Sequence, residues 1–156
     1  MKTIWSNVLF VALILLFIGA GCKPQPTGLQ PPEIKYGFDT CDQCGMQIDA
    51  PRFAAASLLT NDEYRKFDDI GEMLIYHMDH PEAQVQAWFV HDYHSEEWMR
   101  GEEAHFVRSQ SIETPMGFGI VAFQERAKAE SYAAENDGQV YTLDDLRAAL
   151  HAEVHG

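Results

Sequence analysis

The stretch FAAASLLTNDEYRKFDDIGEMLIYHMDH, residues 53–80, predicts how the chain begins to fold. Two runs of strand-forming residues, at 53–60 and 64–67, flank an Asn-Asp turn. The Asp-Asp doublet that follows can cap a helix extending through Asp79. A third strand is expected at residues 85–93, which are rich in β-branched and aromatic side chains. The predicted order is therefore strand, strand, helix, strand.

The second half of the chain shows the same order of expected elements. They fall at residues 104–108, 118–123, 124–136 and 140–142. Thr142 then begins Thr-Leu-Asp-Asp, which resembles a capping box and predicts a last helix from Leu143 to about Val154. The sequence thus predicts an α+β fold of two ββαβ repeats, at about 50–93 and 103–143, followed by a C-terminal helix.

The first residues are not expected to belong to this fold. Lys2 precedes an apolar run at 8–18, which is shorter than the ~20 residues that a membrane-spanning helix needs. The run ends in Gly-Ala-Gly-Cys22 and resembles a bacterial lipoprotein signal, although Gly19 stands where a branched apolar residue is usual. We therefore expect removal of residues 1–21 and lipidation of Cys22. A plainly cleaved signal and a short anchor are the alternatives.

The segment after Cys22 predicts how the folded part is attached. Residues 22–35 are rich in proline and glycine without an apolar period, which is typical of an extended tether. The folded domain is then expected over residues 36–156. Lipid on Cys22 would hold it at a membrane, on the outer side, which is periplasmic or extracellular. The formal net charge of −13 argues against nucleic acid as a partner, because no basic stripe is present to meet phosphates.

The motif Cys41-x-x-Cys44 leaves several chemistries open. A disulfide is expected to form easily outside the cytoplasm. A thioredoxin-like site is disfavoured because no helix is expected after Cys44, and zinc is disfavoured because no second pair of ligands stands at the usual spacing. Thiolate and thioether ligands select Cu(I), and Cys44 with Met46 could provide both from one extended loop. Met116, framed by Pro115 and Gly117, is a candidate third sulfur, although methionines more often fill a core.

Several motifs together resemble the NosL family. They are Cys41-Asp42-Gln43-Cys44-Gly45-Met46-Gln47-Ile48, Phe67-Asp68-Asp69, Val90-His91-Asp92-Tyr93 with Trp98, Ala104-His105-Phe106-Val107, and Pro115-Met116-Gly117. NosL proteins are membrane-tethered accessory proteins of nitrous oxide reductase. The resemblance implies a Cu(I)-binding chaperone, not an enzyme, that serves assembly of the copper sites of that reductase alongside a dedicated ABC transporter complex. It also implies two ββαβ repeats in a fold related to organomercurial lyase.

The resemblance carries Cys44 and Met46 over as Cu(I) ligands, with Met116 as the third. His91 is a further candidate, but it stands where the family more often has a small polar residue. Cys41 is open as a second ligand, a disulfide partner, or neither. Two other functions compete. One is an exported thiol oxidoreductase or lyase-like enzyme using Cys41 and Cys44, with Asp42 as a nearby proton donor. The other is a structural lipoprotein with a Cys41–Cys44 disulfide.

Overall fold

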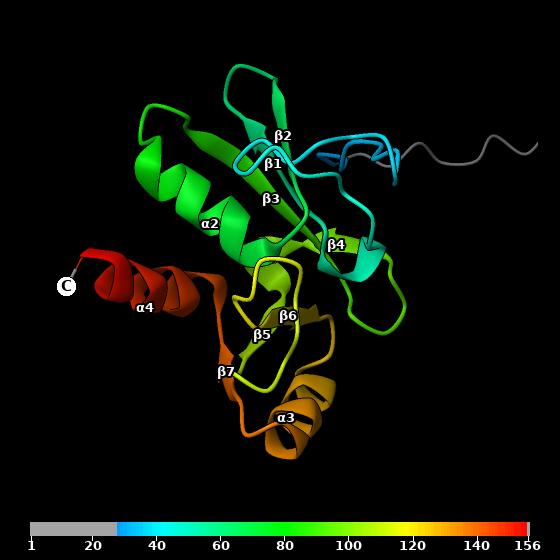
Figure 1. Cartoon of the computed structure of the whole chain (residues 1–156), viewed down its shortest axis with the longest axis vertical. Coiled ribbons are helices and arrows are strands. Elements are labelled where there is room, and N and C mark those ends of the chain that lie inside the picture. Colours follow the sequence, from blue (N-terminus) through cyan, green and yellow to red (C-terminus); the bar gives the residue numbers. More distant parts are fainter. Residues whose placement is uncertain (1–27, 156) are drawn as a thin grey trace, which may run out of the picture. The chain divides into compact units, whose positions relative to one another are not determined.

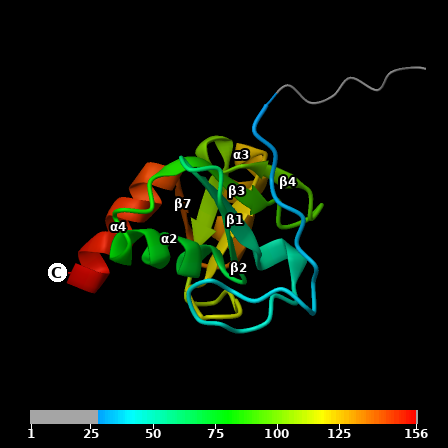
Figure 2. The same cartoon turned by 90° about the horizontal axis from the view of Figure 1, so that it is seen from above.

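The computed structural model describes residues 28–155, shown in Figures 1 and 2. The predicted signal peptide and Cys22 lie outside the described residues. A compact unit begins at Pro31, and Ile34 is buried in its core. The last five residues of the predicted tether therefore belong to the compact unit. Among residues 28–155, none of the helices combines the length and apolar character needed to cross a membrane.

The first half of the compact unit forms a four-stranded antiparallel sheet. Its elements are the 3-10 helix η1 (Pro51–Phe53), the strands β1 (Ala55–Leu59), β2 (Tyr64–Phe67), β3 (Val85–His91) and β4 (Trp98–Arg100), and the helix α2 (Ile70–Asp79). The strand order is β2-β1-β3-β4. All five residues of β1 are buried because this strand is central and is packed against α2.

The second half forms a smaller antiparallel sheet. Its elements are the 3-10 helix η2 (Gly101–Glu103), the strands β5 (His105–Arg108), β6 (Ile120–Phe123) and β7 (Gln139–Tyr141), and the helices α3 (Arg126–Glu135) and α4 (Leu143–His155). The strand order is β6-β5-β7, so the first strand is central, as in the first sheet. The predicted α+β class is confirmed. The relation to organomercurial lyase stays a prediction.

Several details differ from the sequence-based expectation, besides shorter strands β1 and β3. Strand β4 was not expected, and it pairs with the end of β3. Strand β6 begins at Ile120 rather than Phe118, because Gly119 has φ +66°, a left-handed conformation outside the β region. Helix α3 begins at Arg126 rather than Gln124, because the N-cap Glu125 has an extended backbone, φ −101° and ψ 123°. The Gln124 N–H donates to the carboxylate of Asp92 across the junction of the two sheets.

Asp92 fastens the two sheets to each other. It forms a parallel bridge with Ala122 at the end of β3, where the Tyr93 N–H also donates to the Ala122 carbonyl at 2.8 Å. One oxygen of the Asp92 carboxylate accepts the Ser95 N–H at 2.9 Å, and the other accepts the Gln124 N–H at 2.9 Å. Burial raises the pKa of Asp92, but these N–H donors outweigh it, so the pKa lies below its ordinary value.

We expect Asp92→Asn to lower the free energy of unfolding by about 2–3 kcal/mol at neutral pH, because charged hydrogen bonds across the junction are lost. Since folding lowers the pKa of Asp92, the carboxylate stabilises the fold above the ordinary value of 3.8 and loses that effect as the pH falls through its lowered native value. The stability gap between parent and variant should therefore narrow in acid. Urea denaturation at neutral and acid pH measures it, with exposed Asp49→Asn as the control. A gap that is absent at neutral pH would contradict this role.

Candidate metal centre

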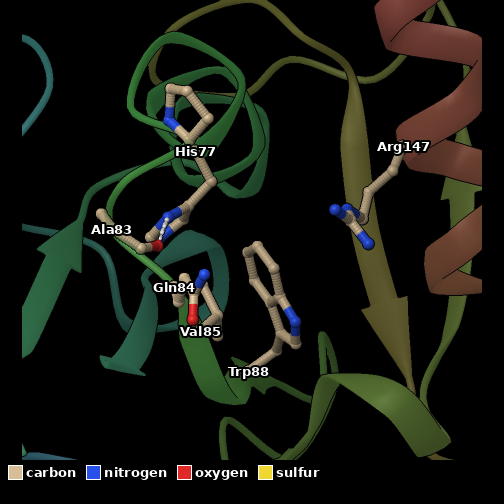
Figure 3. A pocket seen from close by; sticks show the side chains of 7 residues that line it. His77, Ala83, Gln84, Val85, Trp88 and Arg147 are labelled. Carbon is tan, nitrogen blue, oxygen red and sulfur yellow. Dashed lines mark hydrogen bonds between the residues drawn. The ribbon is translucent and has the colours of Figure 1, made fainter. Parts of the chain in front are cut away.

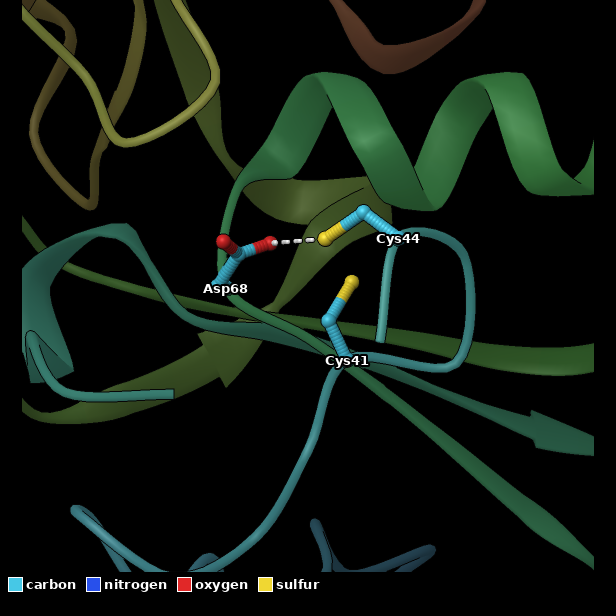
Figure 4. A group of neighbouring side chains, drawn as sticks. All are labelled: Cys41, Cys44 and Asp68. Carbon is cyan, nitrogen blue, oxygen red and sulfur yellow. Dashed lines mark hydrogen bonds between the residues drawn. The ribbon is translucent and has the colours of Figure 1, made fainter. Parts of the chain in front are cut away.

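The loop that carries the two cysteines folds into a tight turn. The Cys41 N–H donates to the Met46 carbonyl at 2.7 Å, and the Gly45 N–H donates to the Cys41 carbonyl at 2.9 Å. Gly45 has φ +72°, which a glycine adopts without a steric penalty. The loop is therefore a closed turn rather than the extended segment that we expected, and it turns both thiols to the same side (Figure 4).

Asp42 attaches this turn to the first sheet. Its N–H donates to the Lys66 carbonyl at 2.8 Å, and its carboxylate accepts the Lys66 N–H at 2.6 Å. The Lys66 ammonium also pairs with Asp39 at 2.7 Å. These contacts hold the cysteine turn beside the end of β2. They also engage the Asp42 carboxylate with the β2 backbone, whereas the enzyme hypothesis would have it serve Cys44 as a proton donor.

Among the described residues, one group of potential metal ligands of the thiol, imidazole and carboxylate types lies together: Cys41, Cys44 and Asp68. One ligand atom from each lies within 4.8 Å of the others. The Cys44 thiol donates to the Asp68 carboxylate at 3.8 Å, as Figure 4 shows. Both cysteines are free thiols, so the structure contains no Cys41–Cys44 disulfide. Asp68 directly follows β2, which explains how the attachment through Asp42 brings the three residues together.

The two thiols differ in their surroundings. Cys41 is only 3% exposed, and burial raises the pKa of its thiol to about 12, against the opposing effect of nearby backbone N–H groups. Cys44 is partly exposed. Cys41 therefore lies on the inner side of the group and keeps its proton near neutral pH, while Cys44 lies on the side open to solvent.

Acidic residues surround the start of α2 next to this group. Asp68, Asp69 and Glu72 are all buried. Burial raises the pKa of Glu72, and the neighbouring carboxylates of Asp68 and Asp69 raise it further. One carboxylate oxygen of Glu72 is buried without a hydrogen-bond partner. Such a concentration of carboxylates favours a cation over an anion near the thiols.

The two methionines that the sequence predicts as ligands have different positions. Met46 follows the cysteine turn and is 54% exposed, which is unusual for a methionine. Met116 lies in the loop between β5 and β6 and is partly buried. Its backbone N–H donates to the Asp69 carboxylate at 3.1 Å. The Met116 loop of the second sheet thus reaches Asp69, the residue next to Asp68.

His91 lies outside the thiol and carboxylate group. It is 2% exposed, and burial lowers the pKa of its imidazole. Nδ1 is hydrogen-bonded to the Ala54 carbonyl at 2.9 Å, and Nε2 to the Tyr36 hydroxyl at 3.2 Å. With both nitrogens engaged, His91 is placed as a core residue against Trp98, with ring centroids 3.6 Å apart.

A separate pocket of about 340 Å³ lies between α2, β3 and α4 (Figure 3). Arg147 extends from α4 over the ring of Trp88, with its guanidinium carbon 5.3 Å from the ring centroid. His77 is the one potential metal ligand in its lining, and its two ring nitrogens bond Ser57 and the Ala83 carbonyl. This pocket therefore does not extend the candidate metal centre.

Asp68 is the site residue that the sequence did not predict as a ligand: it appeared there as a possible helix cap and as part of the family motif Phe67-Asp68-Asp69. The structure gives the capping role to Asp69, whose carboxylate accepts the Gly71 N–H at 2.8 Å. A helix has a single N-cap residue, so a doublet of aspartates leaves one carboxylate for another purpose. The second aspartate of the doublet was therefore the signal in the sequence. In the structure, its carboxylate accepts the S–H of Cys44.

Two free thiols beside a buried carboxylate, on an α+β domain of two antiparallel sheets, define a candidate metal-binding domain. The NosL family model matches residues 35–151, and the chain belongs to this family. The crystal structure of the copper chaperone NosL from Shewanella denitrificans has a similar fold, with a TM-score of 0.63 and 23% sequence identity. The match covers 78% of this chain and 96% of that one. Comparison with the curated proteins yields no match.

Proposed function

We propose that this chain is a membrane-tethered copper chaperone that carries Cu(I) as cargo and delivers it for assembly of the copper sites of nitrous oxide reductase. The observation that supports this most strongly is the Cys41, Cys44 and Asp68 group in a chain of the NosL family. A similar structure belongs to a copper chaperone. Its partners would be the reductase and the ABC transporter complex that serves its maturation.

The ligand types suit Cu(I) as the cargo. Thiolate and thioether sulfur bind this soft ion more strongly than they bind hard ions. Cys44 would be the main ligand, with Cys41 behind it and with Met46 and Met116 as thioether donors. Asp68 accepts the Cys44 S–H, so it orients the sulfur and would be the first acceptor of the proton that ion binding releases to solvent.

The exposure of the site suits transfer as well as binding. A carrier must let the ligands of a partner approach the ion and replace its own ligands one after another. Met46, at 54% exposed, is the most open of the proposed ligands and would be the first to be replaced. Cys41, at 3% exposed, would be the last. Phe38, three residues before Cys41 in the chain, is 82% exposed and would offer a partner an apolar contact.

Selectivity for Cu(I) over Zn(II) tests the function directly. The reduced protein should bind Cu(I) far more tightly than Zn(II), because thioethers such as Met46 and Met116 suit Cu(I), and the ligands of the types that zinc uses, Cys41, Cys44 and Asp68, fall short of a closed set of four. Competition with a chromogenic Cu(I) chelator and, separately, with a Zn(II) chelator measures both affinities. Equal or tighter binding of Zn(II) would contradict the proposal.

The membrane tether gives a further prediction, which rests on the sequence alone. Cys22→Ser should remove the site of lipidation, so the product should be soluble or should keep its signal peptide. Fractionation and mass spectrometry of the N-terminus distinguish these products from the lipidated parent. The proposed anchoring is wrong if the variant is processed and stays membrane-bound as the parent does. Cu(I) affinity of the purified variant should be unchanged, which provides the control.

A further inference from the structure

Asp69 uses its carboxylate to join two distant parts of the chain. It is fully buried. One oxygen accepts the Gly71 N–H at 2.8 Å and caps α2. The other accepts the Met116 N–H at 3.1 Å, and the Thr114 hydroxyl donates to the same carboxylate. Capping needs one oxygen only, so the second is free to hold a loop from the other sheet.

The loop held by Asp69 has a well-defined shape. The Gly117 N–H donates to the Thr114 carbonyl at 3.0 Å, and the Gly119 N–H donates to the Thr114 hydroxyl oxygen at 3.2 Å. Any side chain at Gly119 would meet the Ser109 carbonyl oxygen at 2.0 Å. The loop therefore has little freedom to place Met116 differently while Thr114 remains bonded to Asp69.

The apolar side of the loop packs on the same turn of α2. A Cβ atom at Gly71 would lie 2.1 Å from the Phe118 ring, so the ring lies directly against the helix backbone. Asp69 and Phe118 thus dock the Met116 loop at the start of α2 through a polar and an apolar contact. The neighbouring carboxylate, that of Asp68, faces the Cys44 thiol at 3.8 Å.

The aspartate doublet therefore contacts two loops at once: Asp68 accepts the Cys44 thiol of the cysteine turn, and Asp69 holds the methionine loop. We propose that Asp69 is the positioning residue that places Met116 at the Cu(I) site, while it binds no ion itself. This inference rests on the proposed function. It gives the second sheet a role in Cu(I) binding, because that sheet supplies the Met116 loop. Without the Asp69 contact, this loop would lose its fixed position beside Asp68.

The test is a double-mutant cycle on Cu(I) affinity with Asp69→Asn and Met116→Leu. Asparagine keeps the shape of the side chain but turns one acceptor oxygen into a donor, so one of the two backbone N–H contacts is lost. We expect Asp69→Asn to weaken Cu(I) binding by roughly tenfold or more, the effect typical of groups that orient a ligand. Met116→Leu removes the proposed thioether ligand itself and should weaken binding at least as much. If Asp69 acts through Met116, the double variant should bind as weakly as Met116→Leu alone.

Controls separate positioning from general destabilisation. Asp92→Asn removes a comparable junction carboxylate away from the thiols, and it should lower stability while leaving Cu(I) affinity unchanged. Thr114→Val removes the hydroxyl that joins Asp69 to the loop, and it serves as the second variant if Asp69→Asn does not fold. X-ray absorption should show one sulfur fewer around copper in Asp69→Asn or Thr114→Val, as in Met116→Leu.

Three outcomes would overturn the inference: additive losses in the double variant, unchanged affinity in both Asp69→Asn and Thr114→Val, or unchanged affinity in Met116→Leu. Failure of the proposed function itself is distinguishable, because the parent protein would then show no selective Cu(I) binding in the same titration.

Discussion

Replacing Cys44 by serine should weaken Cu(I) binding by roughly a hundredfold or more, a larger effect than the loss of a group that merely orients a ligand. A hydroxyl is a hard and weakly acidic donor, so it replaces a thiolate poorly at a soft ion. Cys44 is also the group that Asp68 faces, at 3.8 Å from the thiol. Its loss therefore removes both the main sulfur ligand and the sulfur nearest to a proton acceptor.

Competitive titration against a Cu(I) chelator measures this loss. Thermal unfolding of the metal-free variant is the control, and it should change little because Cys44 is only partly buried and sulfur and oxygen differ modestly in size. Parental Cu(I) affinity in a folded Cys44→Ser protein would remove the basis of the proposed site.

The second large effect concerns Cys41 and the dependence of Cu(I) affinity on pH. Burial raises the pKa of the Cys41 thiol to about 12, so Cu(I) must displace a proton from this thiol throughout the neutral range. If Cu(I) binds both cysteines as thiolates, each binding event releases one proton from each thiol that was protonated. At pH values where both thiols are protonated, Cu(I) affinity should then rise about a hundredfold for each pH unit. Cys41→Ser should lower the affinity and reduce this slope to about tenfold per unit.

Met116→Leu provides the contrast, because a thioether carries no proton. It should lower Cu(I) affinity by a constant factor at every pH and leave the slope unchanged. Met99→Leu, a methionine of β4, is the matched control and should change neither quantity. If Cys41→Ser keeps the parental slope, Cys41 does not bind as a thiolate. From the sequence alone Met116 is preferred to Cys41 as the third sulfur. The structure brings the sulfur atoms of Cys41 and Cys44 within 4.8 Å of each other, so Cys41 stays a candidate ligand beside Met116.

Local signals in the sequence predicted much of the fold. Strand β2 was predicted with its observed bounds, since the turn before it contains Asp62 at φ +65°, a conformation that aspartate and asparagine tolerate. Helix α4 begins as its capping-box-like motif indicates, with the Asp145 N–H donating to the Thr142 hydroxyl oxygen. Strand β4 was missed because it has three partly buried residues and is defined by pairing with β3.

The candidate site shows where sequence reasoning ends. The family motif indicated Cys44, but the role of Asp68 depends on an attachment between the cysteine turn and β2, through Asp42 and Lys66. The two residues are 24 positions apart, and no spacing rule links Lys66 to the cysteine motif that contains Asp42. In the same way, the contact between Asp69 and Met116 spans 47 positions. Contacts of this kind follow from how sheets and loops pack, which local propensity and residue spacing do not encode.

Transfer of copper to nitrous oxide reductase is the measurement that tests the central claim most directly. The Cu(I)-loaded protein is mixed with copper-free reductase, in parallel with a chelator that buffers the same concentration of free Cu(I), and reductase copper content is followed over time. The account predicts faster loading from the protein than from the chelator, and slow loading from Cys44→Ser. Loading at the same rate from the protein and from the chelator would contradict delivery by direct contact, and the chain would then be a copper binder without a chaperone function.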